Sequence, residues 1–329
     1  MDAGIIYANA RIKALENNLL TTDKMFRMID SDSLEDAVKV LTESNYGGGI
    51  VLDNPNKFEN LLSGEADQVI KFIKEIMPKD MGIEIFFIKL DYHNAKALMK
   101  AKYHKIESSE SMLYLQGTID TQTLSENIKS DSYGDLYPEM RKALESIDRA
   151  FSEEEKSPRL IDVTLDKAYF KHAKQIAKKG SVIGRYLAAL SDLTNISTFV
   201  RCRKAGLDYK FFFQGMVAEG ELKEDFFKAI YEFSDEMVKE KFKYTSYRYL
   251  AETAIDTKGK ALIEYETKTD DYLLSVFKNE KNDMFTVAPM AGYYLAKMTE
   301  IKVARMVLVC IKNKVDRLLI KQRLRELYA

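Results

Sequence analysis

Glycine and proline are scarce in this chain, with 15 glycines and 5 prolines among 329 residues. Together they occur at about half their usual frequency, since glycine averages ~7% and proline ~5% of protein sequences. β-Proteins reverse direction often and rely on these two residues in their turns. Their scarcity therefore predicts an all-α fold, built from long helices with few connections.

Apolar residues recur at three- and four-residue steps near both ends of the chain. The first stripe consists of Ile5, Ala8, Ile12, Leu15 and Leu19. The second lies in a stretch without glycine or proline, Tyr293 to Ala329, and consists of Tyr294, Met298, Ile301, Ala304, Leu308, Ile311, Val315 and Leu318. Such spacing predicts the buried faces of helices. A continuous helix over the second stretch would be about 55 Å long, at ~1.5 Å per residue.

Local signals predict where helices begin and where loops lie. Asp32, with Glu35 three residues later, has the spacing of an N-cap. Asn54-Pro55 and Pro289 indicate loops. Gly47-Gly48-Gly49 leads into Ile50-Val51, without the Lys and Ser/Thr of a phosphate-binding loop, so we interpret it as a flexible connection.

Charge and apolar run length limit the possible partners. Lys plus Arg number 50 and Asp plus Glu 51, a formal net charge of -1. This balance gives no whole-chain attraction to nucleic acid or to an anionic membrane. The longest notable apolar run, Met306 to Ile311, is far shorter than the ~20 residues of a membrane helix. Cys202 and Cys310 do not suggest a disulfide scaffold and fit a reducing cytoplasm.

Motifs for catalysis or cofactor binding are not found. The sequence contains no phosphate-binding loop and no nucleophile elbow. His93, His104 and His172 have no histidine or cysteine partner at metal-ligand spacing. We therefore expect a protein that is not an enzyme and that has no catalytic residues, no cofactor, no metal site and no directly bound nucleotide.

An internal repeat relates distant parts of the chain. Asp192 and Asn195 follow Asp91 and Asn94 at the same distance, 101 residues, and Asn9 precedes Asn94 by 85. A fainter third copy brings Glu300 near the position of Asn195. Chance similarity is the alternative, but agreement among several shifts favours triplication. It predicts three helical lobes over residues 1–105, 106–205 and 206–329, with the C-terminal helix able to pack near the first lobe.

Two sets of polar residues are candidates for interactions. Asn94 shares a predicted helix face with Phe87, Leu90 and Leu98. Since a buried amide is costly without hydrogen bonds, it either bonds a neighbouring helix end, which we favour, or contacts a ligand. The second set is a basic stretch that contains a single acid, Asp316, and six cations, a net +5: Lys312, Lys314, Arg317, Lys321, Arg323 and Arg325. It fits equally a solvated helix end and a docking patch for an acidic partner.

Several of these residues belong to motifs that resemble a known family, the C subunit of prokaryotic V/A-type ATPases, which is the counterpart of the d subunit in eukaryotic vacuolar ATPases. The motifs span the whole chain. They are Tyr7-x-Asn9-Ala10-Arg11, Asp91-Tyr92-His93-Asn94, Ile161-Asp162-x-x-Leu165-Asp166, Asp192 with Asn195-Ile196-x-Thr198-x-x-Arg201, and Lys297-x-x-Glu300-Ile301-x-x-x-Arg305. Val303 stands where the family resemblance predicts asparagine.

The resemblance implies a funnel of three similar lobes about a pseudo-threefold axis. It further implies a non-catalytic rotor subunit at the cytoplasmic face of the membrane, between the central shaft subunits and the proteolipid ring, that carries rotation for the transport of protons or sodium. The alternative is a generic helical-repeat adaptor unrelated to ATPases. Such an adaptor would need a repeat of ~34 to 47 residues, which the sequence does not contain.

Overall fold

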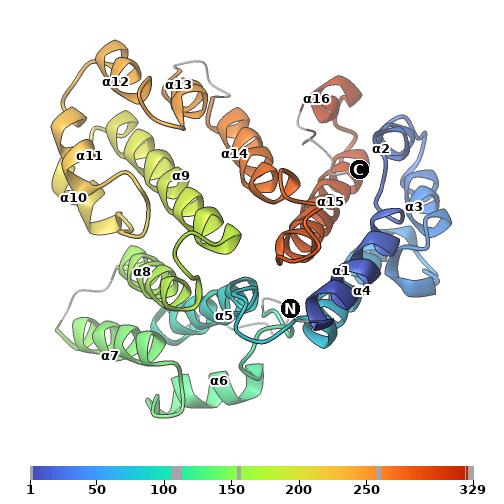
Figure 1. Ribbon diagram of the computed structural model, residues 1–329, viewed down its shortest axis with the longest axis horizontal. Helices are drawn as coiled ribbons and strands as arrows, with labels where there is room; N and C mark the ends of the chain where they lie inside the picture. The colour runs from blue at the N-terminus through green and yellow to red at the C-terminus, as the bar shows by residue number, and fades with distance from the viewer. Residues whose placement is uncertain (1–2, 105–112, 154–156, 257–260, 323, 325–329) are drawn as a thin grey trace. The chain divides into compact units, whose positions relative to one another are not determined.

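The structure, a computed structural model, describes residues 3–104, 113–153, 157–256, 261–322 and 324 (Figure 1). Over these residues the secondary structure is helical, without a strand, so the all-α prediction is confirmed. The chain divides into two compact units. Unit 1 combines Met1–Lys79 with Thr257–Ala329, and unit 2 is Asp80–Asp256. The three lobes with the bounds given above, and their funnel, remain predictions.

Unit 1 joins the two ends of the chain. Its N-terminal part contains α1 (Ala3–Glu16), α2 (Thr22–Ile29), α3 (Leu34–Glu43), the short 3-10 turns η1 (Tyr46–Gly49) and η2 (Pro55–Lys57), and α4 (Phe58–Ile76). Its C-terminal part contains α14 (Ala261–Lys278), α15 (Ala288–Lys312) and α16 (Arg317–Lys321). The helix α15 contacts α1, α2, α3, α4 and α14, and is therefore the centre of the unit.

The ends of α15 differ from the prediction. Pro289 lies in the first turn of the helix rather than in a loop, a position where its missing N–H costs no hydrogen bond. The stretch from Tyr293 does not form one continuous helix either, because α15 ends at Lys312 and Lys314 has a left-handed φ of 54°. Two hydrogen bonds close this turn, from the N–H of Lys314 to the carbonyl of Ile311 (3.0 Å) and from that of Val315 to Cys310 (2.9 Å).

The N-cap of α3 lies one residue later than predicted. Ser33, not Asp32, caps the helix, and its hydroxyl accepts from the N–H of Asp36 at 3.1 Å. Asp32 is instead an exposed residue of the preceding turn, whose carboxylate pairs with Arg317. Both side chains are good N-caps by type, so the sequence pattern could not separate two adjacent candidates.

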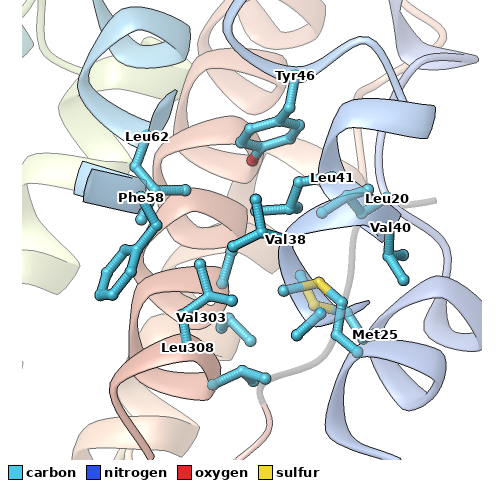
Figure 2. Packing of buried hydrophobic residues seen from close by; sticks show 14 of the residues in the cluster. Leu20, Met25, Val38, Val40, Leu41, Tyr46, Phe58, Leu62, Val303 and Leu308 are labelled. Carbon is cyan, nitrogen blue, oxygen red and sulfur yellow. The ribbon is translucent and has the colours of Figure 1, made fainter. Parts of the chain in front are cut away.

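A hydrophobic core fills the space between α2, α3, the start of α4 and α15 (Figure 2). Its α15 side includes Val303 and Leu308, which are fully buried, and its opposite side includes Met25 and Val38. Val303 thus provides apolar contact here. Burial of a side chain of this size stabilises the fold by about 1.5–3 kcal/mol.

Unit 2 is built on two long helices, α5 (Ile85–His104) and α9 (Val182–Lys204), with α8 (Pro158–Ile176) in contact with both. Shorter helices surround them: α6 (Thr121–Lys129), α7 (Pro138–Ser152), α10 (Tyr209–Gly215), α11 (Glu224–Ile230), α12 (Asp235–Phe242) and α13 (Arg248–Ile255). The helix α6 packs on α5, and α10 and α13 pack on α9. The helix α7 packs instead on α8, and α11 contacts α12.

Candidate functional site: polar pairs on the long helices

The residues that the repeat and the family motifs single out on α5 are buried and hydrogen-bonded. Asn94 is fully buried, and its amide binds both backbone groups of one residue, Tyr114. Its Nδ2 donates to the Tyr114 carbonyl at 2.8 Å, and its Oδ1 accepts from the Tyr114 N–H at 2.8 Å. A side-chain amide can make this two-point contact because it carries a donor and an acceptor side by side.

Asp91, one turn before Asn94, binds the segment that leads into α6. Its carboxylate accepts from the N–H groups of Thr118 (2.8 Å) and Ile119 (3.0 Å), and from the Thr118 hydroxyl (2.5 Å). The approach is close at Gly117, where a Cβ would lie 2.0 Å from Asp91 Oδ1. Glycine is thus required at this position for the contact to form.

The same arrangement recurs on α9. Asn195 donates to the Val217 carbonyl at 2.8 Å and accepts from the Val217 N–H at 2.9 Å. Asp192 accepts from the N–H groups of Glu221 (2.8 Å) and Leu222 (2.9 Å), and a Cβ at Gly220 would lie 2.0 Å from its Oδ1. Burial raises the pKa of the Asp192 carboxyl, although these hydrogen bonds oppose the shift.

We call Asp91 with Asn94, and Asp192 with Asn195, the polar pairs. Each pair is spaced i, i+3, so both side chains project from one face of a long helix. In both copies the asparagine binds one residue of the following loop at two points, and the aspartate binds two consecutive N–H groups a few residues later. The hydroxyl of Tyr247 adds a third hydrogen bond to Asp192, at 2.9 Å.

On α15 charged residues take the corresponding positions. Lys297 and Glu300 are also spaced i, i+3, and both are 2% exposed. The Lys297 Nζ lies 2.6 Å from Glu300 Oε1 and 2.8 Å from Glu65 Oε1. Glu300 also accepts from the Tyr46 hydroxyl (2.8 Å) and from the N–H of Leu20 (2.5 Å). We call Lys297, Glu300, Glu65 and Tyr46 the buried lysine cluster.

Burial determines the electrostatics of this cluster. It raises the pKa of Glu300, against the opposing effect of Lys297, and raises the pKa of Tyr46 well above its ordinary value of 10.0. The family motif contains both Lys297 and Glu300, but sequence analysis assigned a site role to Glu300 alone and missed Glu65. The repeat also pointed to Lys297, since it follows Asp192 by 105 residues, as Glu300 follows Asn195.

The turn η1, predicted as a flexible connection, brings Tyr46 into the cluster. Gly47 and Gly48 have positive φ angles of 71° and 63°, and Tyr46 and Gly47 are buried. The N–H of Gly47 donates to Glu65 Oε2 at 2.8 Å. Gly47 is therefore part of a packed turn.

A cavity of about 290 Å³ adjoins the cluster in unit 1, lined by Leu15, Asn18, Ser44, Asn45, Glu65, Gln68, Val69, Phe72, Tyr293 and Lys297.

The N-terminal family motif lies on α1. Asn9 is fully buried and donates to the carbonyls of Met284 (3.0 Å) and Thr286 (2.8 Å), just before α15. The Arg11 guanidinium lies 4.6 Å from the centre of the Phe72 ring on α4. Tyr7 is exposed. Although Asn9 matches Asn94 in the sequence repeat, it bonds two carbonyls rather than one residue's N–H and carbonyl.

The remaining motif residues are divided between buried and exposed positions. Tyr92 is buried on α5, with its hydroxyl 3.4 Å from His172 Nδ1, and burial raises its pKa. Arg201 lies exposed on α9. Arg305 on α15 pairs with Glu59 on α4, with its Nε 2.9 Å from Glu59 Oε2.

The predicted basic patch is only partly described. Arg317 pairs with Asp32 at 3.2 Å and Lys321 with Asp30 at 2.8 Å. For Lys312 and Lys314, the described part of the chain contains no hydrogen-bond or ion-pair partner of the side chain. Arg323 and Arg325 lie outside the described residues. The patch as a docking surface therefore remains a prediction.

Two searches of the described residues gave negative results. No group of three or more His, Cys, Asp or Glu side chains in them could hold a metal ion. None of the helices they form is both long enough and apolar enough to span a membrane.

The fold and these buried contacts define an all-helical protein in which buried polar side chains on the long helices form hydrogen bonds with loop backbone. Sequence comparisons identify its family. A family model described as ATP synthase (C/AC39) subunit matches residues 8–323. Two curated proteins are similar over nearly the whole chain. The C subunit of the V-type sodium ATPase of Enterococcus hirae is 22% identical over 97% of this chain and 98% of its own length. The C subunit of the A-type ATP synthase of Methanocaldococcus jannaschii is 23% identical over 95% of this chain and 83% of its own.

This chain therefore belongs to the ATP synthase (C/AC39) subunit family, as its motifs indicated. As a member of that family it is a non-catalytic component of a rotary ATPase complex.

Proposed function

We propose that this chain is the rotor subunit that joins the central shaft of a V/A-type rotary ATPase to the proteolipid ring. In this role it lies at the cytoplasmic face of the membrane and transmits torque for ATP-linked transport of protons or sodium. The observation that carries the proposal is the family match over residues 8–323. A generic helical-repeat adaptor is disfavoured by the same match, because it extends over nearly the entire chain.

The internal construction of the chain supports a mechanical role. A coupler must keep its shape under load, so its helices and loops have to be fixed by more than apolar contact. Each polar pair ties a long helix to the backbone of a loop through four or more hydrogen bonds at defined atoms. Such bonds are directional, so they resist displacement that an apolar contact would allow.

The test is reconstitution of the complete complex in vesicles, with and without this chain. ATP hydrolysis and ion pumping are measured separately. We expect the soluble head to hydrolyse ATP without the chain, because the chemistry lies in other subunits. ATP-driven pumping should be lost, because the shaft would no longer drive the ring. Adding the purified chain back should restore pumping.

Two results would contradict the proposal. Full pumping without the chain would show that the shaft reaches the ring by another route. Loss of hydrolysis by the detached head would show a catalytic or allosteric contribution from this chain.

A further inference from the structure

The basic C-terminal stretch folds back onto its own unit. After the left-handed turn at Lys314, the five-residue helix α16 packs against α2. Asp316 caps α16, and its carboxylate accepts from the N–H of Leu318 at 2.7 Å. Two of the six cations that the sequence analysis considered as a docking patch, Arg317 and Lys321, thus have partners within the chain.

The contacts of α16 converge on the turn between α2 and α3. Arg317 donates to the carbonyl of Ser31 at 2.8 Å and pairs with Asp32. Lys321 pairs with Asp30, and its Nζ lies 5.4 Å from the centre of the Phe26 ring. Two cations of α16 are therefore matched to two carboxylates of one turn.

Of the described residues of α16, one has a fully buried side chain, and it anchors the helix. Ile320 is 1% exposed and belongs to the same core as Met25, Met28 and Ile29 of α2. The outward residues Leu318 and Leu319 are 70% and 43% exposed. Only a small part of the apolar surface of α16 is thus removed from water.

The ion pairs that hold α16 are individually weak. The side chains of Arg317 and Asp32 are 49% and 96% exposed, and those of Lys321 and Asp30 are 36% and 50% exposed. Ion pairs at such positions contribute little and are screened by salt. A helix of five residues does not form on its own in water. The detachment of α16 should therefore require far less free energy than the unfolding of unit 1.

We propose that α16 is a releasable strap, hinged at Lys314. It closes over the packed helix pair α2 and α3, the α2–α3 hairpin, and forms ion pairs with Asp30 and Asp32. In the closed state the strap covers part of the core of unit 1 and neutralises the acidic turn. In the open state that part of the core becomes accessible, and Asp30 and Asp32 lose their ion-pair partners. The strap thereby controls whether the surface of the α2–α3 hairpin beneath α16 is exposed. This inference concerns the isolated chain and does not rest on the coupling role proposed above.

Amide hydrogen exchange of the full-length chain tests the strap. The test variant is Arg317→Gln with Lys321→Gln. The matched control is Lys312→Gln with Lys79→Gln, which removes the same charge from two cations of unit 1 that lie outside the strap and its hinge. The readout is exchange in α2, and the internal reference is exchange in α4 of the same unit.

We expect exchange in α2 to accelerate in the test variant by roughly 2- to 30-fold, the factor that corresponds to two exposed ion pairs. Exchange in α4 should not change, and the control variant should match the unmodified chain. Raising the salt concentration should accelerate α2 exchange in the unmodified chain more than in the test variant, because only the former retains the pairs to be screened.

Ile320→Ala provides an independent measurement, since it weakens the anchor without changing charge, and it should also accelerate exchange in α2. The proposal is overturned if exchange in α2 is unaffected by both changes. It is overturned equally if α2 and α4 accelerate together, because the contacts would then stabilise the whole unit rather than hold a local strap.

Discussion

At the scale of single residues, the asparagines at the repeat positions illustrate how one side chain can fix a loop. Asn94 and Asn195 each present a donor and an acceptor to the backbone of one residue, Tyr114 or Val217. Leucine has a similar volume and could fill the same space, but it would leave both backbone groups without a partner. An unpaired polar group in a buried position costs about 1–3 kcal/mol.

We therefore predict that Asn94→Leu lowers the free energy of unfolding by about 1–3 kcal/mol, because it removes the partner of the Tyr114 N–H and carbonyl. Urea denaturation followed by far-UV circular dichroism measures the change. Asn60→Leu, at an exposed position of α4, is the control and should alter stability little. Unchanged stability together with lost binding to partner subunits would show instead that Asn94 acts as an intermolecular contact.

At the scale of elements, the long helices use different chemistry for similar purposes. The helices α5 and α9 carry Asp and Asn, whereas α15 carries Lys297 and Glu300 with Glu65 from α4. Burial of charges is expensive unless each is paired and hydrogen-bonded. Glu300 meets this condition with three partners, the ammonium of Lys297, the Tyr46 hydroxyl and the Leu20 N–H. Even so, burial raises its pKa, because desolvation outweighs those contacts.

This shift predicts a pH dependence of stability. The ordinary pKa of the Glu300 carboxyl is 4.5, and its value in the folded chain is higher. Between the two values the folded state holds a proton that the unfolded state has released. The contribution of Glu300 to the free energy of unfolding therefore falls as pH rises through this window. Glutamine does not titrate, so Glu300→Gln should lack this component.

The measurement is urea denaturation of the unmodified chain and of Glu300→Gln at several pH values from about 4.5 upward, the ordinary pKa of glutamate. The stability of the unmodified chain relative to the variant should decrease as pH rises. Glu75→Gln, at an exposed position on α4, serves as control and should follow the unmodified chain. A stability difference that stays constant or grows with pH would contradict the assigned shift.

At the scale of the whole molecule, the balanced charge is relevant to how the chain would bind its neighbours. With 50 basic and 51 acidic residues, the chain has no overall charge that would dominate association. Specific contacts must then come from local complementary charges, which set register and orientation more than affinity. Such contacts suit a proposed coupler, because its orientation on the shaft decides whether rotation is transmitted.

We predict accordingly that binding to the central shaft subunits weakens as ionic strength rises. The Debye length falls from ~8 Å at physiological ionic strength to ~3 Å at 1 M, so exposed pairs are progressively screened. Titration calorimetry with the purified shaft subunits at both ionic strengths measures the effect. Circular dichroism at each salt concentration checks that the chain stays folded. Equal affinity at low and high salt would show that the interface is essentially apolar.

The helical class and the repeated residues were accessible from the sequence, because both depend on local or periodic patterns. Scarce glycine and proline indicated helices, and the 101-residue spacing brought out Asp91 with Asp192 and Asn94 with Asn195. The helix ends were harder to predict. A stretch without glycine or proline from Tyr293 suggested one helix, but Lys314 adopts a left-handed conformation without glycine, and the apolar stripe ends in the exposed Leu318.

What the sequence determined by itself is the fold class, the family and the positions of the repeated polar residues, since each follows from residue identity and spacing along the chain. What only the tertiary structure decided is which groups meet across long sequence distances. Glu65 and Glu300 flank Lys297, and the cations of α16 meet Asp30 and Asp32. The identity of a lysine or of an acidic residue in the sequence does not indicate whether its side chain is solvated or buried. Its environment depends on packing that brings residues more than 200 positions apart into contact, which no local pattern records.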